Sequence, residues 1–280
     1  MFFNLFGPKE AGQLFRTVMG REPAEEELGY LLSALSKTDW FGDIKKLMLS
    51  NVGVESELHR AADLHLYLIH AARLKMIKLL MPPGEVILDL GGANAPLYRM
   101  GYPYPFKKLF LIDFSEDHRH ESFKDVSLER TADGGEIILR YADMTDLSAF
   151  GDETVDLVWS GQSIEHVIPS QGVRMCTEAY RVLKPGGSFC LDTPNRLVTE
   201  LHTRTVGGGF IHPDHKIEYT PRQLREILIT AGFNIVSEWG ICEMPLTTLR
   251  GEFTYEDFVV GGAISLNPDR SYIQYYHCKK

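Results

Sequence analysis

The chain has 280 residues, of which 44% are hydrophobic and 24% are charged, so it is ordinary globular material with enough length for a sizeable core. Its formal net charge of -9 argues against nucleic acid or an anionic membrane surface as a partner. No stretch approaches the ~18 uninterrupted apolar residues of a membrane span, and the N-terminus lacks the basic residues that lead a signal peptide.

The first elements expected along the chain are helical. Apolar residues recur at helical spacing between residues 10 and 50, and Pro23 followed by three glutamates is typical of a helix start. Three short helices would be marginal alone, so we interpret residues 1–54 as an N-terminal helical appendage. A longer helix follows from about Glu55 to Leu80, and residues 55–280 are expected to form the main domain.

Strands and helices alternate after Gly84, which predicts an α/β fold with a mostly parallel seven-stranded sheet and helices on both of its faces. The clearest helical patterns cover Val173 to Leu183 and Pro221 to Ala231. Ligands of such sheets bind beyond the carboxyl ends of the strands. The seven expected strands are Val86–Leu90, Leu109–Asp113, Ile137–Tyr141, Val155–Ser160, Ser188–Asp192, Ile235–Glu238 and Tyr272–Tyr276.

The turn after the first strand, "VILDLGGANAP", predicts a ligand that lacks a pyrophosphate. Gly91 and Gly92 allow the backbone to turn and to approach a ligand closely. The dinucleotide fingerprint requires glycines where this chain has Ala93 and Pro96. The turn therefore argues against a nicotinamide dehydrogenase.

Three aspartates lie at or near the carboxyl ends of three successive expected strands. Asp89 precedes the glycine turn, Asp113 ends the second strand in a position to accept hydrogen bonds from ribose hydroxyls, and Asp143 could accept an amino proton of a purine. Met144 would supply apolar contact to the purine ring. An aspartate after a strand is commonly only a turn or cap residue, so the argument rests on the three acids together.

These stretches resemble the class I S-adenosylmethionine-dependent methyltransferases over roughly residue 55 to the C-terminus. "VILDLGGANAP" is similar to that family's nucleotide loop, "LIDFS" to its ribose acid, "YADMTDL" to its adenine motif, "VDLVWSGQSIEHV" to its fourth strand and "EAYRVLKPGGSFCLDTPN" to its signature helix, turn and fifth strand. The resemblance implies a Rossmann-like fold and S-adenosylmethionine as cofactor, although alanines stand at positions 93 and 95 where the family usually has glycines. The cofactor-binding residues that it implies are Asp89, Gly91, Gly92, Ala93, Asn94, Asp113, Phe114, Asp143, Met144 and Ser160.

Histidines are the candidate bases, because a hydroxyl acceptor must lose a proton near neutral pH. His166 follows the fourth strand, although it could instead cap a helix or pack beneath the cofactor. His212 and His215 lie in "GGGFIHPDHKIEYTP", a glycine-rich segment expected to form a mobile loop at the substrate edge, and are the preferred bases. Their alternative role is to order that loop.

A divalent metal is the less favoured alternative, and we expect none to be required. Some members of the resembling family bind a metal through Glu-x-x-Glu-His and a later histidine. Here Gln162 replaces the first acid, which leaves Glu165, His166 and either His212 or His215 as an incomplete ligand set.

The predicted function is methylation of a sugar or glycan hydroxyl, or of another small molecule. The segment "LFRTVMGREPAEEELGYLLSAL" resembles a small bacterial helical domain of unknown function that accompanies enzymes of surface glycans. Phe253, Tyr255 and Phe258 could line a saccharide platform, although they could instead belong to the local core. Nitrogen or carbon acceptors and a non-catalytic binding scaffold remain open. The four scattered cysteines, which form no C-x-x-C pair, favour a cytoplasmic location, and the number of subunits stays open.

Overall fold

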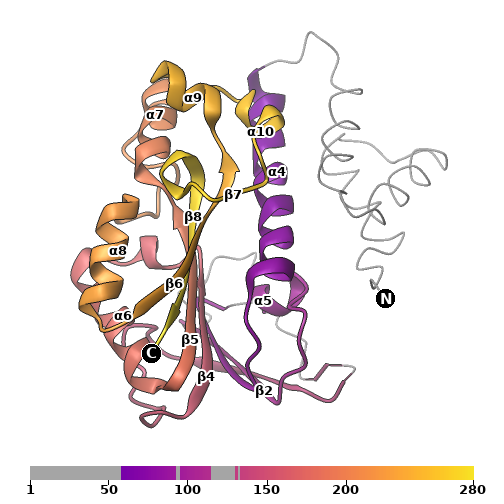
Figure 1. Ribbon diagram of the computed structural model, residues 1–280, viewed down its shortest axis with the longest axis vertical. Coiled ribbons are helices and arrows are strands. Elements are labelled where there is room, and N and C mark those ends of the chain that lie inside the picture. The colour runs from indigo at the N-terminus through magenta and orange to yellow at the C-terminus, as the bar shows by residue number, and fades with distance from the viewer. Residues whose placement is uncertain (1–57, 93–94, 115–129, 132) are drawn as a thin grey trace, which may run out of the picture.

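The computed structural model describes residues 58–92, 95–114, 130–131 and 133–280, so the helical appendage expected over residues 1–54 lies outside the described residues. In the described part, the long helix α4 (Leu58–Leu80) leads into the central sheet (Figure 1). None of the helices in the described part is both long and apolar enough to cross a membrane.

The sheet has eight strands in the order β3-β2-β1-β4-β5-β8-β6-β7. Neighbours from β3 to β5 run parallel, whereas β8 pairs with β5 and β6 in antiparallel fashion. This confirms the predicted fold class, with one strand more than expected. The strands are β1 (Val86–Leu90), β2 (Lys108–Asp113), β3 (Glu136–Tyr141), β4 (Val155–Gly161), β5 (Leu183–Pro194), β6 (Asn234–Glu243), β7 (Ile264–Ser265) and β8 (Ser271–Lys279).

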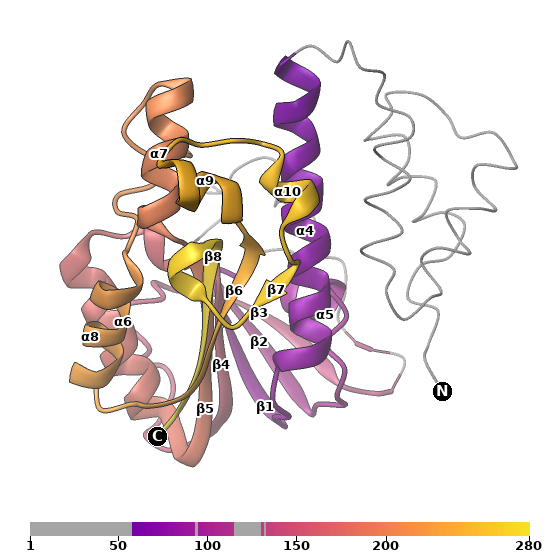
Figure 2. The ribbon, with the colours of Figure 1, turned by 45° about the horizontal axis from the view of Figure 1, so that its top comes forward.

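Helices cover both faces of the sheet. Figure 2 shows α4 and α5 on one side and α6 and α8 on the other, while α7, α9 and α10 gather at the end of the molecule where β5 ends. Within this group α9 packs against α7, and α10 packs against α4. The further helical bounds are α5 (Pro96–Arg99), η3 (Ile164–His166), α6 (Pro169–Val182), α7 (Arg196–Val206), α8 (Pro221–Thr230), α9 (Pro245–Arg250), α10 (Asp257–Val260) and η4 (Pro268–Arg270).

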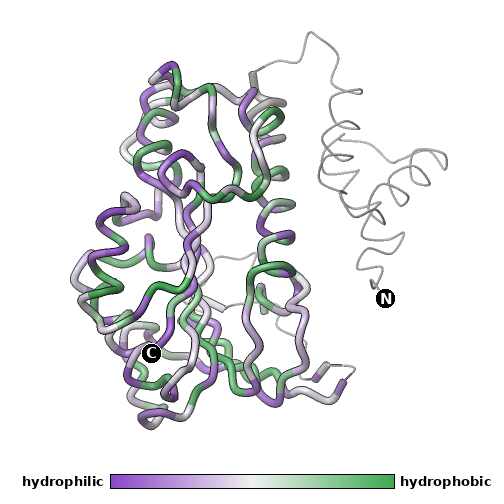
Figure 3. The backbone as a smooth tube through the Cα atoms, in the orientation of Figure 1, coloured by the Kyte–Doolittle hydropathy of each residue, from purple (hydrophilic) through white to green (hydrophobic). Residues whose placement is uncertain are grey.

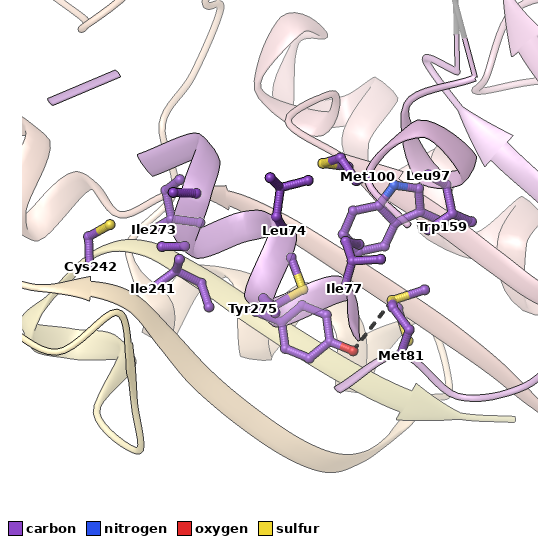
Figure 4. Close-up of a cluster of buried hydrophobic side chains, with 14 of the residues drawn as sticks. Leu74, Ile77, Met81, Leu97, Met100, Trp159, Ile241, Cys242, Ile273 and Tyr275 are labelled. Atoms are coloured by element: carbon purple, nitrogen blue, oxygen red, sulfur yellow. Dashed lines mark hydrogen bonds between the residues drawn. The ribbon is translucent and has the colours of Figure 1, made fainter. Parts of the chain in front are cut away.

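Side-chain alternation divides the core into two layers, because successive residues of a strand point to opposite faces. One layer lies between the sheet and α4 and is called the α4 layer, and the other lies between the sheet and helices α6 and α8 and is called the α6 and α8 layer. In β1, Ile87 belongs to the α4 layer and Leu88 belongs to the α6 and α8 layer. Hydrophobic and hydrophilic residues also alternate along the outer helices (Figure 3). In the α4 layer, Trp159 and Tyr275 are fully buried, and the Tyr275 hydroxyl lies 3.8 Å from the sulfur of Met81 (Figure 4).

The chain order places the candidate site between β1 and β4. From β1 the chain moves outward to β2 and β3, and it then returns to β4 on the other side of β1. Such a reversal opens a crevice at the carboxyl ends of the two central strands. The turn after β1 and the segment after β4 therefore face the same crevice.

Candidate functional site

The glycine turn after β1 is held against the end of β2. The N–H groups of Gly91 and Gly92 both donate to the carbonyl of Ile112, at 2.8 and 3.2 Å. Gly91 has a φ of +72°, in the left-handed region that favours glycine. The predicted contacts Ala93 and Asn94 lie outside the described residues.

We expect Gly91→Ala to destabilise the protein more than Gly186→Ala does. Both glycines have a φ near +70°, which costs a residue with a Cβ about 1–2 kcal/mol. A Cβ at Gly91 would lie 2.5 Å from the Ser163 hydroxyl oxygen, whereas one at Gly186 would meet no atom within 4 Å. The Ser163 hydroxyl also donates to the Leu90 carbonyl, so the clash would disturb the end of β1.

Urea denaturation of both variants measures the difference, because Gly186 reproduces the backbone strain without the clash. Equal losses of unfolding free energy would show that the turn tolerates a side chain at residue 91.

Asp89 is a buried carboxyl group at the carboxyl end of β1. One oxygen accepts a hydrogen bond from the Leu97 N–H at 3.2 Å, at the start of α5. Burial, together with the nearby acids Asp113 and Asp192, raises the pKa of Asp89 to about 8. A cation that binds beside Asp89 would therefore stabilise its ionised form.

Unpaired buried polar atoms gather around the ends of β1 and β4. Seven buried side-chain atoms of the described residues have no hydrogen-bond partner. Two of them, His65 Nδ1 and Tyr219 Oη, lie elsewhere, and the other five belong to β1, β4 or the segment after β4: Asp89 Oδ1, Trp159 Nε1, Ser160 Oγ, Gln162 Nε2 and Glu165 Oε1. Residue 162 also has a φ of +57°, which is uncommon for glutamine. Native proteins rarely leave such atoms unsatisfied, so their concentration here indicates a site for a polar ligand.

The remaining predicted cofactor residues occupy different environments. Asp113 is half-buried at the end of β2 and accepts a hydrogen bond from the N–H of Phe114, whose side chain is 49% exposed. Asp143 accepts from the Thr145 N–H at 2.8 Å, which is the turn role weighed above. Met144 is buried in the α6 and α8 layer, and alternation along β4 directs Ser160 to that same face, opposite to Asp89.

The structure adds an ion pair that the sequence did not indicate. Arg73 of α4 donates to both carboxylate oxygens of Asp192 at the end of β5, with distances of 2.5 and 3.0 Å. Asp192 is fully buried, and the Arg73 guanidinium supplies both of these hydrogen bonds to it. The two residues are 119 positions apart, and only the packing of α4 on the sheet brings them together.

The structure brings the three candidate histidines together beyond β4. The ring centroid of His166 lies 5.0 Å from that of His215 and 6.0 Å from that of His212. His215 is buried, and its Nδ1 lies 2.9 Å from Glu218 Oε1. His212 is more exposed, and its Nδ1 accepts a hydrogen bond from the Asp214 N–H at 3.2 Å.

Glu165 completes this cluster. Its carboxylate is buried and accepts a hydrogen bond from the Thr193 hydroxyl at 2.8 Å, and burial raises its pKa to about 7. Partial burial and the two neighbouring histidines lower the pKa of His166 to about 4. One potential ligand atom from each of Glu165, His166 and His215 lies within 4.8 Å of the others, whereas His212 is not part of this set.

Two of the three aromatic residues considered for a saccharide platform take the core alternative instead. Phe258 is 2% exposed and packs against α4, and Phe253 stacks on His202 with ring centroids 3.9 Å apart. The two ring nitrogens of His202 lie within hydrogen-bond distance of the Tyr272 and Tyr255 hydroxyls, which leaves its faces free for stacking. Phe253 and Phe258 are therefore core residues and offer no open surface to a sugar.

Parts of this chain are similar to known proteins. Residues 88–191 match a family model described as a methyltransferase domain. A Mycolicibacterium smegmatis protein named "Probable S-adenosylmethionine-dependent methyltransferase" is 33% identical over 103 residues, 37% of this chain and 37% of that protein. A ubiquinone biosynthesis O-methyltransferase of Caulobacter vibrioides is 27% identical over 176 residues, 59% of this chain and 65% of that protein.

Among solved structures, an S-adenosylmethionine-dependent methyltransferase from Thermotoga maritima has a TM-score of 0.54 at 16% identity, covering 78% of this chain and 91% of that one. This likeness shows the fold, and the matches to the two curated relatives span less than two thirds of their lengths. Residues 88–191 are a methyltransferase domain of the S-adenosylmethionine-dependent type, which confirms the predicted enzyme class and cofactor for this domain.

Proposed function

We propose that the whole chain is an S-adenosylmethionine-dependent methyltransferase that methylates a hydroxyl group of a sugar, a glycan or another small molecule. The observation that carries this proposal is the group of unpaired buried polar atoms at the ends of β1 and β4, directly before the histidine cluster. The unpaired polar atoms fit the cofactor, and the histidine cluster fits an acceptor that must lose a proton.

The residues at the strand ends fit the chemistry of the cofactor. Asp89 offers an unpaired oxygen to the ammonium group of the methionine moiety, Asp113 lies one strand further for the ribose hydroxyls, and Asp143 follows β3 for the adenine amino group. Gly91 and Gly92 let this turn pack directly on Ser163 and Asp89, because a Cβ at either position would clash with those residues. When bound, S-adenosylmethionine supplies an electrophilic methyl group on a positively charged sulfur.

Alignment of the acceptor with that methyl group accounts for most of the rate, and the histidine cluster supplies the proton transfer. The hydroxyl proton passes to His215 as the acceptor oxygen forms its bond to the methyl carbon. The carbon–sulfur bond breaks, and its electron pair stays on sulfur. His166 and Glu165 line the same point and hold the hydroxyl in place.

The acceptor class is argued from one relative and from the N-terminal segment. The Caulobacter relative is named an O-methyltransferase, which favours oxygen over nitrogen or carbon as the acceptor atom. The glycan acceptor follows from the resemblance of the N-terminal segment stated above. The four cysteines, all buried and free, support the expected reducing, cytoplasmic location.

Calorimetry and labelled turnover test this function. We expect S-adenosylmethionine and its demethylated product to bind while NAD does not, and we expect methyl-labelled cofactor to label a saccharide hydroxyl in a panel of sugars, phenols and amines. Binding of neither sulfur ligand would favour the non-catalytic scaffold, and labelling of amines alone would replace the oxygen acceptor with nitrogen.

A divalent cation at Glu165, His166 and His215 is a second candidate for activating the hydroxyl. The specific observation in its favour is the convergence of one carboxylate and two imidazoles within 4.8 Å, a nitrogen and oxygen set that suits several divalent metals. Both histidines would have to be neutral in order to ligate, and the lowered pKa of His166 favours that state.

Exhaustive chelation followed by metal analysis separates the two candidates. We expect turnover to survive chelation unchanged if the histidine acts as a base alone. Loss of turnover that Mn²⁺ or Mg²⁺ restores, with binding of S-adenosylmethionine unaffected throughout, would select the cation.

A further inference from the structure

Glu218 is a buried carboxylate that nothing in the reaction scheme above uses. It lies between the glycine-rich loop and α8, and its side chain is fully buried. It accepts hydrogen bonds from the Thr199 hydroxyl of α7 and from the Ile211 N–H at 2.8 Å. Its Oε1 also lies 2.9 Å from His215 Nδ1, and Arg196 Nη1 lies 3.5 Å from its other oxygen.

These partners keep Glu218 ionised. Both of its oxygens act as acceptors, Oε1 for the Ile211 N–H and Oε2 for the Thr199 hydroxyl, and the Arg196 guanidinium lies beside Oε2. An ionised carboxylate can only accept hydrogen bonds. His215 Nδ1 must therefore carry the proton that it shares with Glu218, and the lone pair of neutral His215 lies on Nε2.

The neighbouring histidine has the opposite arrangement. Nδ1 of His212 accepts the Asp214 N–H, so neutral His212 carries its proton on Nε2. The two histidines are only three residues apart on one loop, yet Nε2 of His215 offers a lone pair whereas Nε2 of His212 offers a donor. Only His215 has the form that a base or a metal ligand needs at that nitrogen.

The same carboxylate also fastens the loop. Arg196 donates to the Gly209 carbonyl at 2.8 Å, and its guanidinium lies 5.2 Å from the centre of the Phe210 ring. Further along, the Lys216 N–H donates to the Glu165 carbonyl at 2.8 Å. Glu218 and Arg196 thus hold the loop backbone on α7 on one side, while the chain after His215 is held on Glu165.

We propose that Glu218 is a positioning residue of the methyl transfer: it fixes the Nδ1–H form of His215 and stabilises the imidazolium that forms when Nε2 takes the acceptor proton. The inference rests on the proposed function, and it applies equally if Nε2 binds a cation, because a carboxylate behind a ligating imidazole fixes the ring in the same way. Glu218 does not touch the reacting atoms.

Histidine ¹⁵N NMR of the full chain tests the positioning role without an acceptor. In the wild type we expect His215 in the Nδ1–H form and His212 in the Nε2–H form. In Glu218→Gln, the amide can both donate and accept, so the preference of His215 is lost and both forms are populated. Glu200→Gln is the matched control, since Glu200 contacts the same Arg196 from a more exposed position and should change neither ring.

The wild-type spectrum alone decides the central point, even if Glu218→Gln fails to fold. An Nε2–H form of His215 in the wild type would overturn the inference, and so would a folded Glu218→Gln that keeps the Nδ1–H form alone. Failure of every acceptor to be methylated, with the expected pair of tautomers observed, would contradict the proposed function and leave the tautomer assignment intact.

Turnover with an identified acceptor adds a second readout. Loss of the carboxylate behind His215 makes its imidazolium less favourable, so the acid-side limb of the kcat profile should move to lower pH in Glu218→Gln while the KM for S-adenosylmethionine stays unchanged. A uniform fall of kcat at every pH, with no movement of that limb, would indicate a structural role and contradict the inference.

Discussion

Asp89→Asn is expected to stabilise the unliganded protein and to weaken S-adenosylmethionine binding by roughly 10- to 100-fold. The loss of affinity corresponds to a charge-assisted hydrogen bond of about 1.5–3 kcal/mol between Asp89 and the cofactor's ammonium group. The gain in stability arises because the substitution removes a carboxyl group whose ionisation the fold resists. A residue with only a structural role would lose stability on substitution.

The pH dependence follows from the pKa of Asp89, which is about 8 in the fold instead of 3.8. Between these two values the folded protein binds more protons than the unfolded chain at this site, so the contribution of Asp89 to stability falls as the pH rises. Cofactor affinity behaves in the opposite way. It should increase with pH up to about 8 and then level off, because the ammonium group favours the ionised carboxylate.

Asp156→Asn is the matched control, because Asp156 lies at the opposite end of β4. Partial burial opposes its ionisation, but hydrogen bonds from Lys184 and from the Val86 N–H hold the pKa of Asp156 below its usual range. Asp156→Asn should therefore lower the free energy of unfolding at neutral and alkaline pH and leave cofactor binding unchanged. Denaturant unfolding measures the stability of the two variants from pH 6 to 9, and calorimetry measures their cofactor affinity over the same range. An Asp89→Asn protein that binds the cofactor as tightly as the wild type across this range would contradict the assignment.

Local sequence patterns sufficed for most of the fold. The central strands are buried on both faces, so they form apolar runs that stand out from the amphipathic helices around them. Strand β7 was not predicted, because a strand of two residues, Ile264 and Ser265, is too short to show any periodicity. Strand β5 begins at Leu183 instead of Ser188, since the Pro-Gly-Gly segment that suggests a turn is included in its extended chain.

The partners of the site residues could not be predicted, because they depend on packing between distant segments. Arg73 meets Asp192 only after α4 packs against the sheet. Phe253 has the same sequence signal whether it faces a sugar or the core, and only its burial against His202 decides between them. His212 and His215 look equivalent in the sequence, whereas their hydrogen bonds give them opposite proton positions.

That difference between the two loop histidines leads to the second large prediction. His215→Ala should lower kcat by roughly 10²- to 10⁴-fold, the usual contribution of a positioned acid or base. Cofactor affinity should stay the same, because the residues that fit the cofactor lie at the ends of β1 to β3 and not on this loop. His212→Ala should cost far less, since the proton on its Nε2 prevents that nitrogen from acting as a base.

Removal of His215 also takes one donor from the buried Glu218 carboxylate, so a structural cause of any lost activity must be separated from a chemical one. Added imidazole makes the separation, because it can occupy the space left by the side chain and accept the acceptor's proton. We expect imidazole to restore part of the turnover of His215→Ala, in proportion to its unprotonated fraction, and to leave His212→Ala unchanged. Full turnover in both single variants would exclude the loop as the source of the base, and a deficit in His215→Ala that imidazole never relieves would assign His215 to the architecture of the loop.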